Sequence, residues 1–384
     1  KNNGGKKKVL ASVLAGLAMV GVAAQMGTPV QAGANNSGNA VNLWADKKLD
    51  GSNNTANTVG ANSVAVGNNL VAGSASTTPT GRLGGTAIAI GVDSQAKDDR
   101  NIAIGYNNTT EGQDSVAMGS NVIAGTGQSI AIGSTNTDAT TGVQTQTIAR
   151  GTVTMKNGRP EPAAAIAIGS GAQAIDGSGL VAMGQLAKAN KNNTVAIGTK
   201  AEATNTNSTA VGSYSQAKGT SSAAFGTQAL ANGLGAAAFG PGASAGNGDA
   251  DGAADGAVAI GRKATVAKGA AGGTAIGWAS EATKADATAI GHSANANIAG
   301  GVALGSESKT TVDKGVKGFN PAEVRTNKYA GLAANVQTST LAAVSVGDGA
   351  TATRQITGLA AGTADSDAVN VAQLRSVNLK YAGD

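Results

Sequence analysis

A short apolar run that ends in glycine recurs along most of the chain, and its spacing is nearly constant. It reads "SVAVG" at residue 63, "NIAIG" at 101 and "SIAIG" at 129. Nine of the fifteen intervals between successive closing glycines are 14 residues, and inserted loops account for the longer ones. Repetition at a short fixed period predicts a solenoid, in which each repeat forms one coil. The closing glycines are Gly67, Gly91, Gly105, Gly119, Gly133, Gly169, Gly184, Gly198, Gly212, Gly226, Gly240, Gly261, Gly277, Gly291, Gly305 and Gly347.

Each coil is too short for a pair of helices but has room for two short strands and two turns. Within a run, large and small side chains alternate with the period of two that a strand requires. The residue before the glycine is always large and apolar, and the residue two before it is alanine in fifteen of sixteen repeats, with Ser345 the exception. A second alanine commonly follows five residues after the glycine. We therefore predict an all-β, parallel solenoid.

The two faces of the main strand predict two different cores. The alanine face suits the thin interior of a coil, because larger side chains do not fit between strands so close together. The aliphatic face then looks outward, and a continuous ladder of Ile and Val is not left in water, so a second copy of the chain must cover it. The reverse assignment of the faces would leave the need for a partner unchanged. The residues predicted for this shared core are Ile104, Ile130, Ile132, Ile197, Phe225 and Phe239.

Two repeats support a shared core of limited volume. Where the residue before the glycine is Phe225 or Phe239, the residue two positions earlier becomes Ala223 or Ala237. Large and small side chains are thus exchanged on one face, as close packing demands.

Composition agrees with a narrow core. The 384 residues include three Phe, two Trp and four Tyr, but 58 Gly. Such a chain cannot fill a wide core, although it can line one in which backbones approach closely. Disorder is the competing interpretation of a chain rich in Gly, Asn, Ser and Thr, but disordered segments do not repeat a hydrophobic pattern in register.

The first 32 residues have the pattern of a signal peptide. Lys6, Lys7 and Lys8 precede an apolar stretch at 9–24, and "TPVQA" ends in small residues that suit cleavage. A membrane span needs about 20 apolar residues. The stretch is shorter than that, so a membrane anchor retained in the mature protein is the less favoured alternative. Export to an oxidising compartment follows, although the chain has no Cys and must be stable without disulfides.

The net charge of +5 comes mostly from this segment. Four Lys and no acid lie within the first 32 residues, which leaves 24 basic and 23 acidic residues, or +1, for the remainder. Neither a basic stripe nor a motif that reads bases is present, so we expect no nucleic-acid partner.

After Gly347 the pattern changes from strand to helix. In "DSDAVNVAQL", Asp365 or Ser366 can cap a helix, and Val371, Leu374 and Val377 follow at helical spacing. A helix this short is marginal alone, so we expect the beginning of a coiled coil.

The repeats and the string "RQITGLAAGTADSDAVNVAQL" at 354–374 together resemble the trimeric autotransporter adhesins with YadA-like heads. The resemblance covers 61–378 apart from insertions. It implies a left-handed parallel β-roll in each chain, a homotrimer, and a neck that leads into a coiled-coil stalk. It also implies export, display at the cell surface on a Gram-negative outer membrane through a C-terminal anchor absent from this chain, and attachment to host extracellular-matrix proteins, cell-surface receptors or other bacteria, with no enzymatic activity and no cofactor.

The expected domains follow from these patterns. The first insert, with "TVTMKNGRPEP", predicts a hairpin around Asn157 and Gly158. The expected segments are a signal peptide at 1–32, a lead-in at 33–60, head repeats at 61–305 with an insert at 134–165, a second insert and the last head strand at 306–346, a neck at 347–377, and the start of the stalk at 378–384.

Candidate catalytic or metal-binding groups are sparse. His292 is the single histidine and follows a closing glycine, which makes an exposed turn residue the favoured interpretation over a catalytic or metal-binding role. Asp249, Asp251 and Asp255 lack the spacing of a calcium loop, and a flexible acidic loop is favoured. The glycines at 240–246 lack the lysine of a phosphate-binding loop, so turns are favoured there. We expect no catalytic or metal site.

Three aromatic residues are candidates for ligand contact. Tyr106, Tyr214 and Trp278 are expected in turns, and exposed aromatic side chains favour protein recognition. The alternative is that each packs over a neighbouring turn or subunit. A different function class, a secreted β-solenoid that binds carbohydrate or ice or degrades glycans, would need a regular outward ladder or a pair of carboxylates, and the sequence shows neither.

Overall fold

The computed structural model describes residues 62–73, 86–152, 163–246, 254–318 and 334–381, together with five short strands outside these ranges. The chain divides into two compact units, residues 1–187 and 188–384. Residues 1–29 of the expected signal peptide lie outside the described residues. The strands at the N-terminal end are β1 (Val30–Ala32), which pairs antiparallel with β2 (Val41–Ala45), and β3 (Thr58–Val59).

Unit 1 is a parallel β-solenoid with two sheets, as the repeat predicts. Strands that precede the closing glycines form the first sheet, and the shorter strands that follow them form the second. After β2, the first sheet continues through β4 (Val64–Asn68), β6 (Ile88–Val92), β8 (Ile102–Tyr106), β10 (Val116–Ser120), β12 (Ile130–Ser134), β18 (Ala165–Ile168) and β20 (Leu180–Met183). After β3, the second sheet continues through β5 (Val71–Ala72), β7 (Gln95–Ala96), β9 (Thr109–Thr110), β11 (Ile123–Ala124), β15 (Ile148–Arg150) and β19 (Gln173–Ile175).

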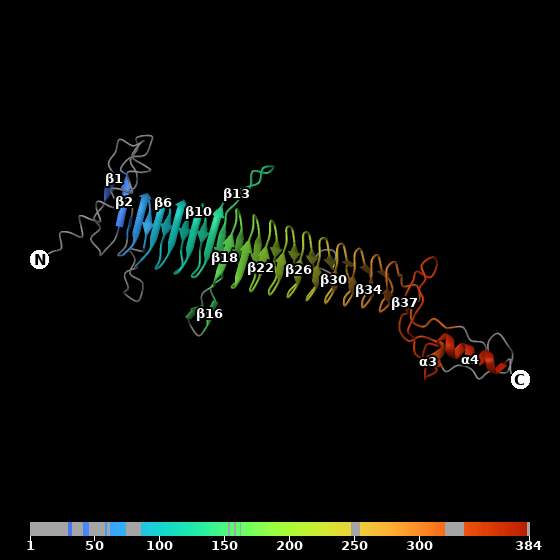
Figure 1. The fold of residues 1–384 in the computed structure, drawn as a ribbon. Helices are drawn as coiled ribbons and strands as arrows, with labels where there is room; N and C mark the ends of the chain where they lie inside the picture. The colour runs from blue at the N-terminus through green and yellow to red at the C-terminus, as the bar shows by residue number, and fades with distance from the viewer. Residues whose placement is uncertain are drawn as a thin grey trace. The chain divides into compact units, whose positions relative to one another are not determined.

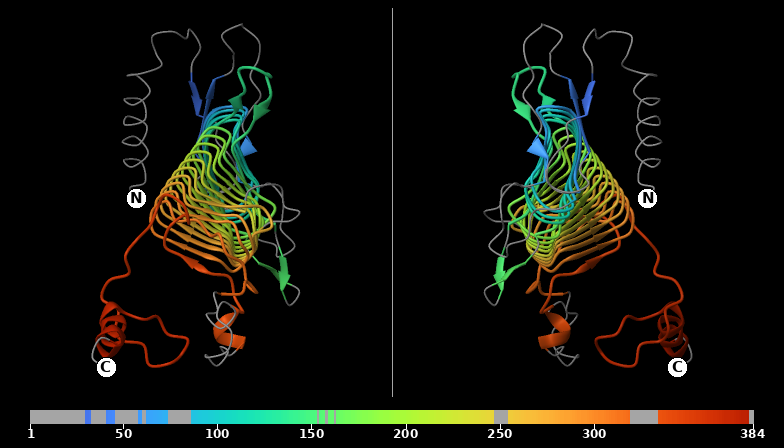
Figure 2. Two further views of the ribbon diagram at one scale, coloured as in Figure 1. Left: turned by 90° about the vertical axis from the view of Figure 1, so that its right-hand side faces the viewer. Right: turned by 90° about the vertical axis from the view of Figure 1, so that its left-hand side faces the viewer.

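Unit 2 repeats the same plan. Its first sheet contains β22 (Val195–Ile197), β24 (Thr209–Val211), β26 (Ala223–Phe225), β28 (Ala237–Phe239), β30 (Val258–Ile260), β32 (Thr274–Ile276), β34 (Thr288–Ile290), β36 (Val302–Leu304) and β37 (Val344–Ser345). Its second sheet contains β21 (Lys188–Asn190), β23 (Glu202–Ala203), β25 (Gln216–Ala217), β27 (Leu230–Ala231), β29 (Ser244–Ala245), β31 (Thr265–Val266), β33 (Glu281–Ala282) and β35 (Asn295–Ala296). In Figure 2 the coils within each unit superpose along the stack.

The register places equivalent residues of successive repeats side by side. In the parallel pair of β10 and β12, Ala117 lies opposite Ala131 and Gly119 opposite Gly133. The alanine two before each glycine is buried, with 0% exposure at Ala117, Ala131 and Ala196. The alanines of the second sheet, such as Ala124 and Ala203, are also 0% exposed. The interior is therefore thin and lined mainly by alanine, and the predicted assignment of the alanine face is confirmed. Its largest buried apolar side chains are Leu70, Val122, Leu180 and Val266.

The closing glycine is required by its backbone and by close packing. Gly119 has φ +132°, and a Cβ atom built there would overlap the carbonyl oxygen of Gly133 in the next coil. No side chain fits between coils at this point, which explains why the repeat keeps glycine here.

Unit 1 carries two antiparallel hairpins within the insert at 134–165. Strands β16 (Thr154–Lys156) and β17 (Arg159–Glu161) flank Asn157 and Gly158, as the sequence predicts. A second hairpin, of β13 (Asn136–Thr137) and β14 (Gln144–Thr145), is not predicted by the sequence pattern. The two hairpins project from opposite edges of the coils (Figure 1).

The end of unit 2 contains two helices, α3 (Ala334–Gln337) and α4 (Val371–Tyr381). A helix over Val371 and Leu374 is confirmed, but the predicted caps Asp365 and Ser366 are wrong. Asn370 caps α4, because its Oδ1 accepts a hydrogen bond from the Gln373 N–H at 3.0 Å. Across the described residues, no helix has the length and apolar content to cross a membrane.

Candidate binding surfaces

The first candidate surface is the outward face of the first sheet, which we call the aliphatic ladder. Its residues are the large apolar side chains one and three positions before each closing glycine. In a single chain they stay partly exposed, whereas the alanines between them are fully buried. More than a third of the residue is exposed at Ile132 (37%), Ile197 (37%), Phe239 (39%), Ile260 (39%) and Leu304 (44%), among others. Ile104, Ile130 and Phe225 also lie on this face and are partly exposed.

Two phenylalanines make a direct contact on the ladder. Phe225 and Phe239 lie opposite each other in the parallel pair of β26 and β28. Their rings are stacked, with centroids 5.1 Å apart and planes 2° from parallel. Ala223 and Ala237 lie opposite each other on the same face. The large-for-small exchange of the sequence thus takes place on one outward surface, as predicted.

The neck adds further exposed apolar side chains. On α4, Val371 is 65% exposed and Leu374 is 59% exposed. Ile356 is 67% exposed and Val369 is 66% exposed in the segment that leads to the helix. A monomeric soluble protein rarely exposes so much contiguous apolar surface, so this segment has the character of an interface.

The second candidate surface consists of the two residues after each closing glycine, and we call it the glycine corner. Tyr106, Tyr214 and Trp278 all belong to it and are 53%, 48% and 52% exposed. The prediction that Tyr106 lies in a turn is wrong, because pairing of β8 with β6 and β10 extends the strand through this residue.

The glycine corner of unit 2 brings cations onto aromatic rings. The Lys200 Nζ atom lies 5.3 Å from the centroid of the Tyr214 ring, and the Arg262 Cζ atom lies 5.7 Å from that of Trp278. These are cation–π contacts between neighbouring coils. Lys200 and Arg262 were not recognised as candidates from the sequence, although alignment of the repeats puts both at the glycine corner.

His292 joins this group from the next coil. Its ring centroid lies 4.7 Å from that of Trp278, with the planes tilted by 40°. The imidazole Nε2 and the Ser293 Oγ are 3.3 Å apart, which orients the ring. His292 is exposed, as expected of a turn residue. The structure therefore places Arg262, Trp278 and His292 in a row on three successive coils.

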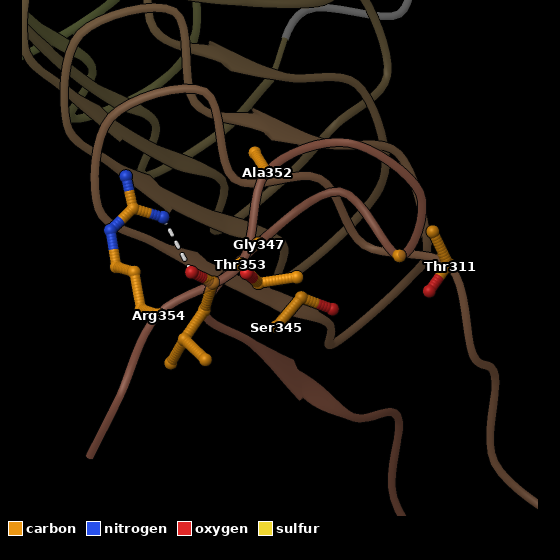
Figure 3. Close-up of a pocket in the computed structure, with 8 residues that line it drawn as sticks. Thr311, Ser345, Gly347, Ala352, Thr353 and Arg354 are labelled. Atoms are coloured by element: carbon orange, nitrogen blue, oxygen red, sulfur yellow. Dashed lines mark hydrogen bonds between the residues drawn. The ribbon is translucent and has the colours of Figure 1, made fainter.

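A third feature lies where the solenoid meets the neck, and sequence reasoning missed it. The Arg354 guanidinium donates a hydrogen bond to the carbonyl oxygen of Val346 (Figure 3). It also donates to the Ser308 Oγ at 2.9 Å and to the carbonyl oxygen of Ser306. The side chain lies against Gly305, where a Cβ atom would be 2.9 Å from the Arg354 Cζ. An open pocket beside it is lined by Thr311, Ser345, Gly347, Ala352 and Thr353.

Two aspartates of the neck hold turns through their carboxylates. Hydrogen bonds from the Thr351 hydroxyl and from the backbone N–H groups of Ala350 and Ala352 lower the pKa of Asp348 well below its usual range. Hydrogen bonds from the N–H groups of Ala364 and Thr363 lower the pKa of Asp367. In both aspartates these hydrogen bonds stabilise the charged carboxylate, because N–H and O–H donors bind the ionised form more strongly.

Ion pairs among the described residues lie in unit 1. Lys97 and Arg150 both contact Glu111, at 3.7 and 3.2 Å, and Arg100 pairs with Asp114. The Asp114 hydrogen bond raises the pKa of Arg100, and the Arg100 hydrogen bond lowers that of Asp114. Exposed pairs of this kind add little to stability.

The acidic loop is only partly described, since Asp249 and Asp251 lie outside the described residues and Asp255 is exposed. Within the described ranges, no group of three or more His, Cys, Asp or Glu residues is placed to hold a metal ion.

Sequence comparisons match both parts of the chain. The YadA head domain repeat matches residues 83–107, 102–121, 181–201, 189–215, 203–229, 217–243 and 282–308. The coiled stalk of trimeric autotransporter adhesin matches residues 355–381. The matched head segments contain ten of the sixteen closing glycines and the alanines that precede them, and the matched stalk segment contains α4.

One curated relative and one solved structure are similar to parts of this chain. The autotransporter adhesin BadA of Bartonella henselae is 49% identical over 67 residues, which are 17% of this chain and 2% of that protein. The crystal structure of the collagen-binding domain of the Yersinia adhesin YadA is 33% identical, with a TM-score of 0.36, over 52% of this chain and 88% of that domain. On the matches to head repeats and stalk together, the chain belongs to the trimeric autotransporter adhesins.

Proposed function

We propose that this chain forms the head and neck of a homotrimer that is displayed on a Gram-negative outer membrane and attaches to host extracellular matrix, host cells or other bacteria. Adhesins of this family are structural proteins without enzymatic activity, and the prediction of a non-catalytic chain agrees with that membership. The chain covers 2% of the length of BadA. Surface display and adhesion are therefore proposals for this chain.

The observation that carries the proposal is the aliphatic ladder. Large apolar side chains repeat on the outward face of the strands at the closing glycines, and in one chain they keep about two fifths of their surface exposed at positions such as Ile260 and Phe239. They point away from the coil interior, which is lined mainly by buried alanine. Side-by-side packing of three chains would bury the ladders of all three against one another.

Three copies also suit adhesion. A rigid stack presents the same surface three times, so weak contacts with a repetitive partner add up through avidity. The residues of the glycine corner and the two hairpins vary between repeats while the ladder stays constant. We assign recognition to these variable parts and assembly to the constant ones.

The test is solid-phase binding of the purified protein to collagen, fibronectin and laminin, and to host cells. Two variants locate the contact in unit 1: one lacks residues 138–143 at the tip of β13–β14, and the other lacks residues 154–161. Both keep β15, which is part of the second sheet. We expect the intact protein to bind at least one matrix protein or cell surface.

Each hairpin variant controls for the other, since both remove a projection from the same unit. A loss confined to one variant would place the contact at that hairpin, and retention in both would place it on the coils. Absence of binding to every matrix protein and cell type by a correctly assembled protein would contradict the proposed function.

A further inference from the structure

The glycine corner of unit 2 has an unusual set of side chains. From Gly198 to Gly291, three of its side chains are cations, Lys200, Arg262 and Lys263, and three are rings, Tyr214, Trp278 and His292. It carries no carboxylate until Glu307. The positions concerned are Thr199, Lys200, Ser213, Tyr214, Thr227, Gln228, Pro241, Gly242, Arg262, Lys263, Trp278, Ala279, His292 and Ser293.

The cations of this corner have rings as neighbours in place of acids. Lys200 lies over Tyr214, and Arg262 lies over Trp278. Every salt bridge found among the described residues joins residues of unit 1, so neither of these two cations is paired with a carboxylate there. Arg262 therefore keeps a planar fork of N–H donors that suits an anionic oxygen pair.

The indole ring of Trp278 has a neighbour from the coil on each side, and the residue stays 52% exposed. Arg262 comes from the coil before it and His292 from the coil after it, at 5.7 and 4.7 Å from the ring centroid. The row presents the donor groups at the edges of the guanidinium and the indole.

The donors repeat along the stack and extend over a long distance. Coils in a parallel sheet are about 4.8 Å apart. Six coil intervals separate Gly198 from Gly291, so Lys200 and His292 are roughly 29 Å apart along the axis. A small anion reaches one cation–ring pair, whereas a linear polymer with repeated acidic groups reaches both.

We propose that the glycine corner of unit 2 binds a linear sulfated polysaccharide that runs along the solenoid axis. Its sulfate groups contact Lys200, Arg262 and Lys263, and the indole N–H group adds a donor between them. Duplex DNA is the alternative linear polyanion, and competition between the two is an outcome of the test. The proposal rests on the proposed adhesive function and names a ligand class for it.

The same corner in unit 1 provides a contrast. There the equivalent positions hold amides that bond to one another or to an acid. Asn69 donates to the Asp93 carboxylate at 2.6 Å, and Asn107 donates to the Asn121 carbonyl oxygen at 2.7 Å. Those amides have partners and no positive charge, so the predicted binding belongs to unit 2.

The experiment measures binding of the full chain, in its native oligomeric state, to immobilised heparin. The test variant is R262A/K263A. The matched control is K268A/K284A, which removes two exposed lysines from the opposite turn of neighbouring coils. We expect R262A/K263A to weaken binding at least tenfold and to reduce its dependence on salt, while the control stays within twofold of wild type. Binding should also strengthen as heparin fragments lengthen.

Several results would overturn the proposal. Equal losses in the test and control variants would mean that net charge alone is responsible. Equal competition by duplex DNA would contradict the polysaccharide class. A changed sedimentation mass for R262A/K263A or W278A would make the corner a subunit contact. If the protein attaches to matrix but does not bind heparin, this inference is wrong and the proposed function stands. If it binds heparin but attaches to neither matrix nor cells, the proposed function is wrong and this inference stands.

Discussion

Arg354 and Ser308 lie 46 residues apart in the chain, yet the Arg354 Nη1 donates to the Ser308 Oγ at 2.9 Å. The same guanidinium binds the carbonyl oxygens of Ser306 and Val346, so it ties the neck to the end of the solenoid. Replacement of Arg354 by alanine should lower the free energy of unfolding by about 1 to 3 kcal/mol, because a charged donor set is lost. Chemical denaturation at fixed protein concentration measures this.

Arg375 on α4 is a matched control, since it is an exposed arginine of the same region. R375A should change stability by less than about 0.5 kcal/mol. The free energy of unfolding of R354K should be close to that of R354A, because one ammonium group cannot reproduce the planar fork of the guanidinium. Full stability in R354A would show that the guanidinium contacts do not hold the junction.

The thin interior predicts that a larger buried side chain is costly. Ala210 is 0% exposed and lies opposite Ala196 and Ala224 in the first sheet. A210L should destabilise the protein by about 3 kcal/mol, since the coils cannot separate locally to make room. Q216L, which adds a similar apolar side chain on the outward face of the second sheet, serves as the control. Similar melting temperatures for the two variants would be inconsistent with an alanine-filled core.

The closing glycine should resist substitution more than a glycine at a hairpin tip. G119A places a Cβ atom against the Gly133 carbonyl oxygen at a positive φ, and we expect a loss of roughly 3 kcal/mol or more. Gly142 has φ +70° but no heavy atom within 4 Å of an added Cβ, so G142A should cost about 1 kcal/mol. Thermal unfolding of both variants gives the comparison, and an equal cost would contradict the close-packing argument.

Acidification should loosen the neck. The native pKa of Asp348 is lowered by its hydrogen bonds to Thr351, Ala350 and Ala352, so the carboxylate stabilises the folded chain at neutral pH. This stabilisation is present above the unfolded pKa of about 3.9 and is lost as the pH falls below it toward the depressed native value. D348N removes the charge, so its stability should vary less with pH than that of wild type below pH 4. Parallel unfolding curves for the two proteins across that range would exclude this role.

The repeat predicts the coils because one residue pattern serves every coil. Each coil packs against a neighbour with the same pattern. This packing places alanine inward, aliphatic side chains outward and glycine at the corner, and the pattern recurs in sixteen repeats. The repeat pattern does not predict the hairpin β13–β14. Its residues carry no alternation, and its turn depends on the Asp138 carboxylate, which accepts hydrogen bonds from the N–H groups of Thr140 and Thr141.

Contacts between residues far apart in the chain could not be predicted from the sequence either. The role of Arg354 depends partly on the Ser306 carbonyl group, 48 positions earlier, which no local pattern marks. The cap of α4 was misplaced because Asp365, Ser366, Asp367 and Asn370 all have cap-forming side chains, and only the structure shows that Asp367 binds a preceding turn. The row of Arg262, Trp278 and His292 was accessible in principle, because all three follow a closing glycine directly.

The central claim is that the aliphatic ladder is buried by two further copies of the chain. Sedimentation equilibrium of residues 33–384 tests it most directly, with I197K/I260K as a companion that places charge on the ladder while leaving the alanine interior unchanged. The account predicts a mass three times that of the chain for wild type and dissociation of the companion variant. A well-folded wild-type monomer would contradict it.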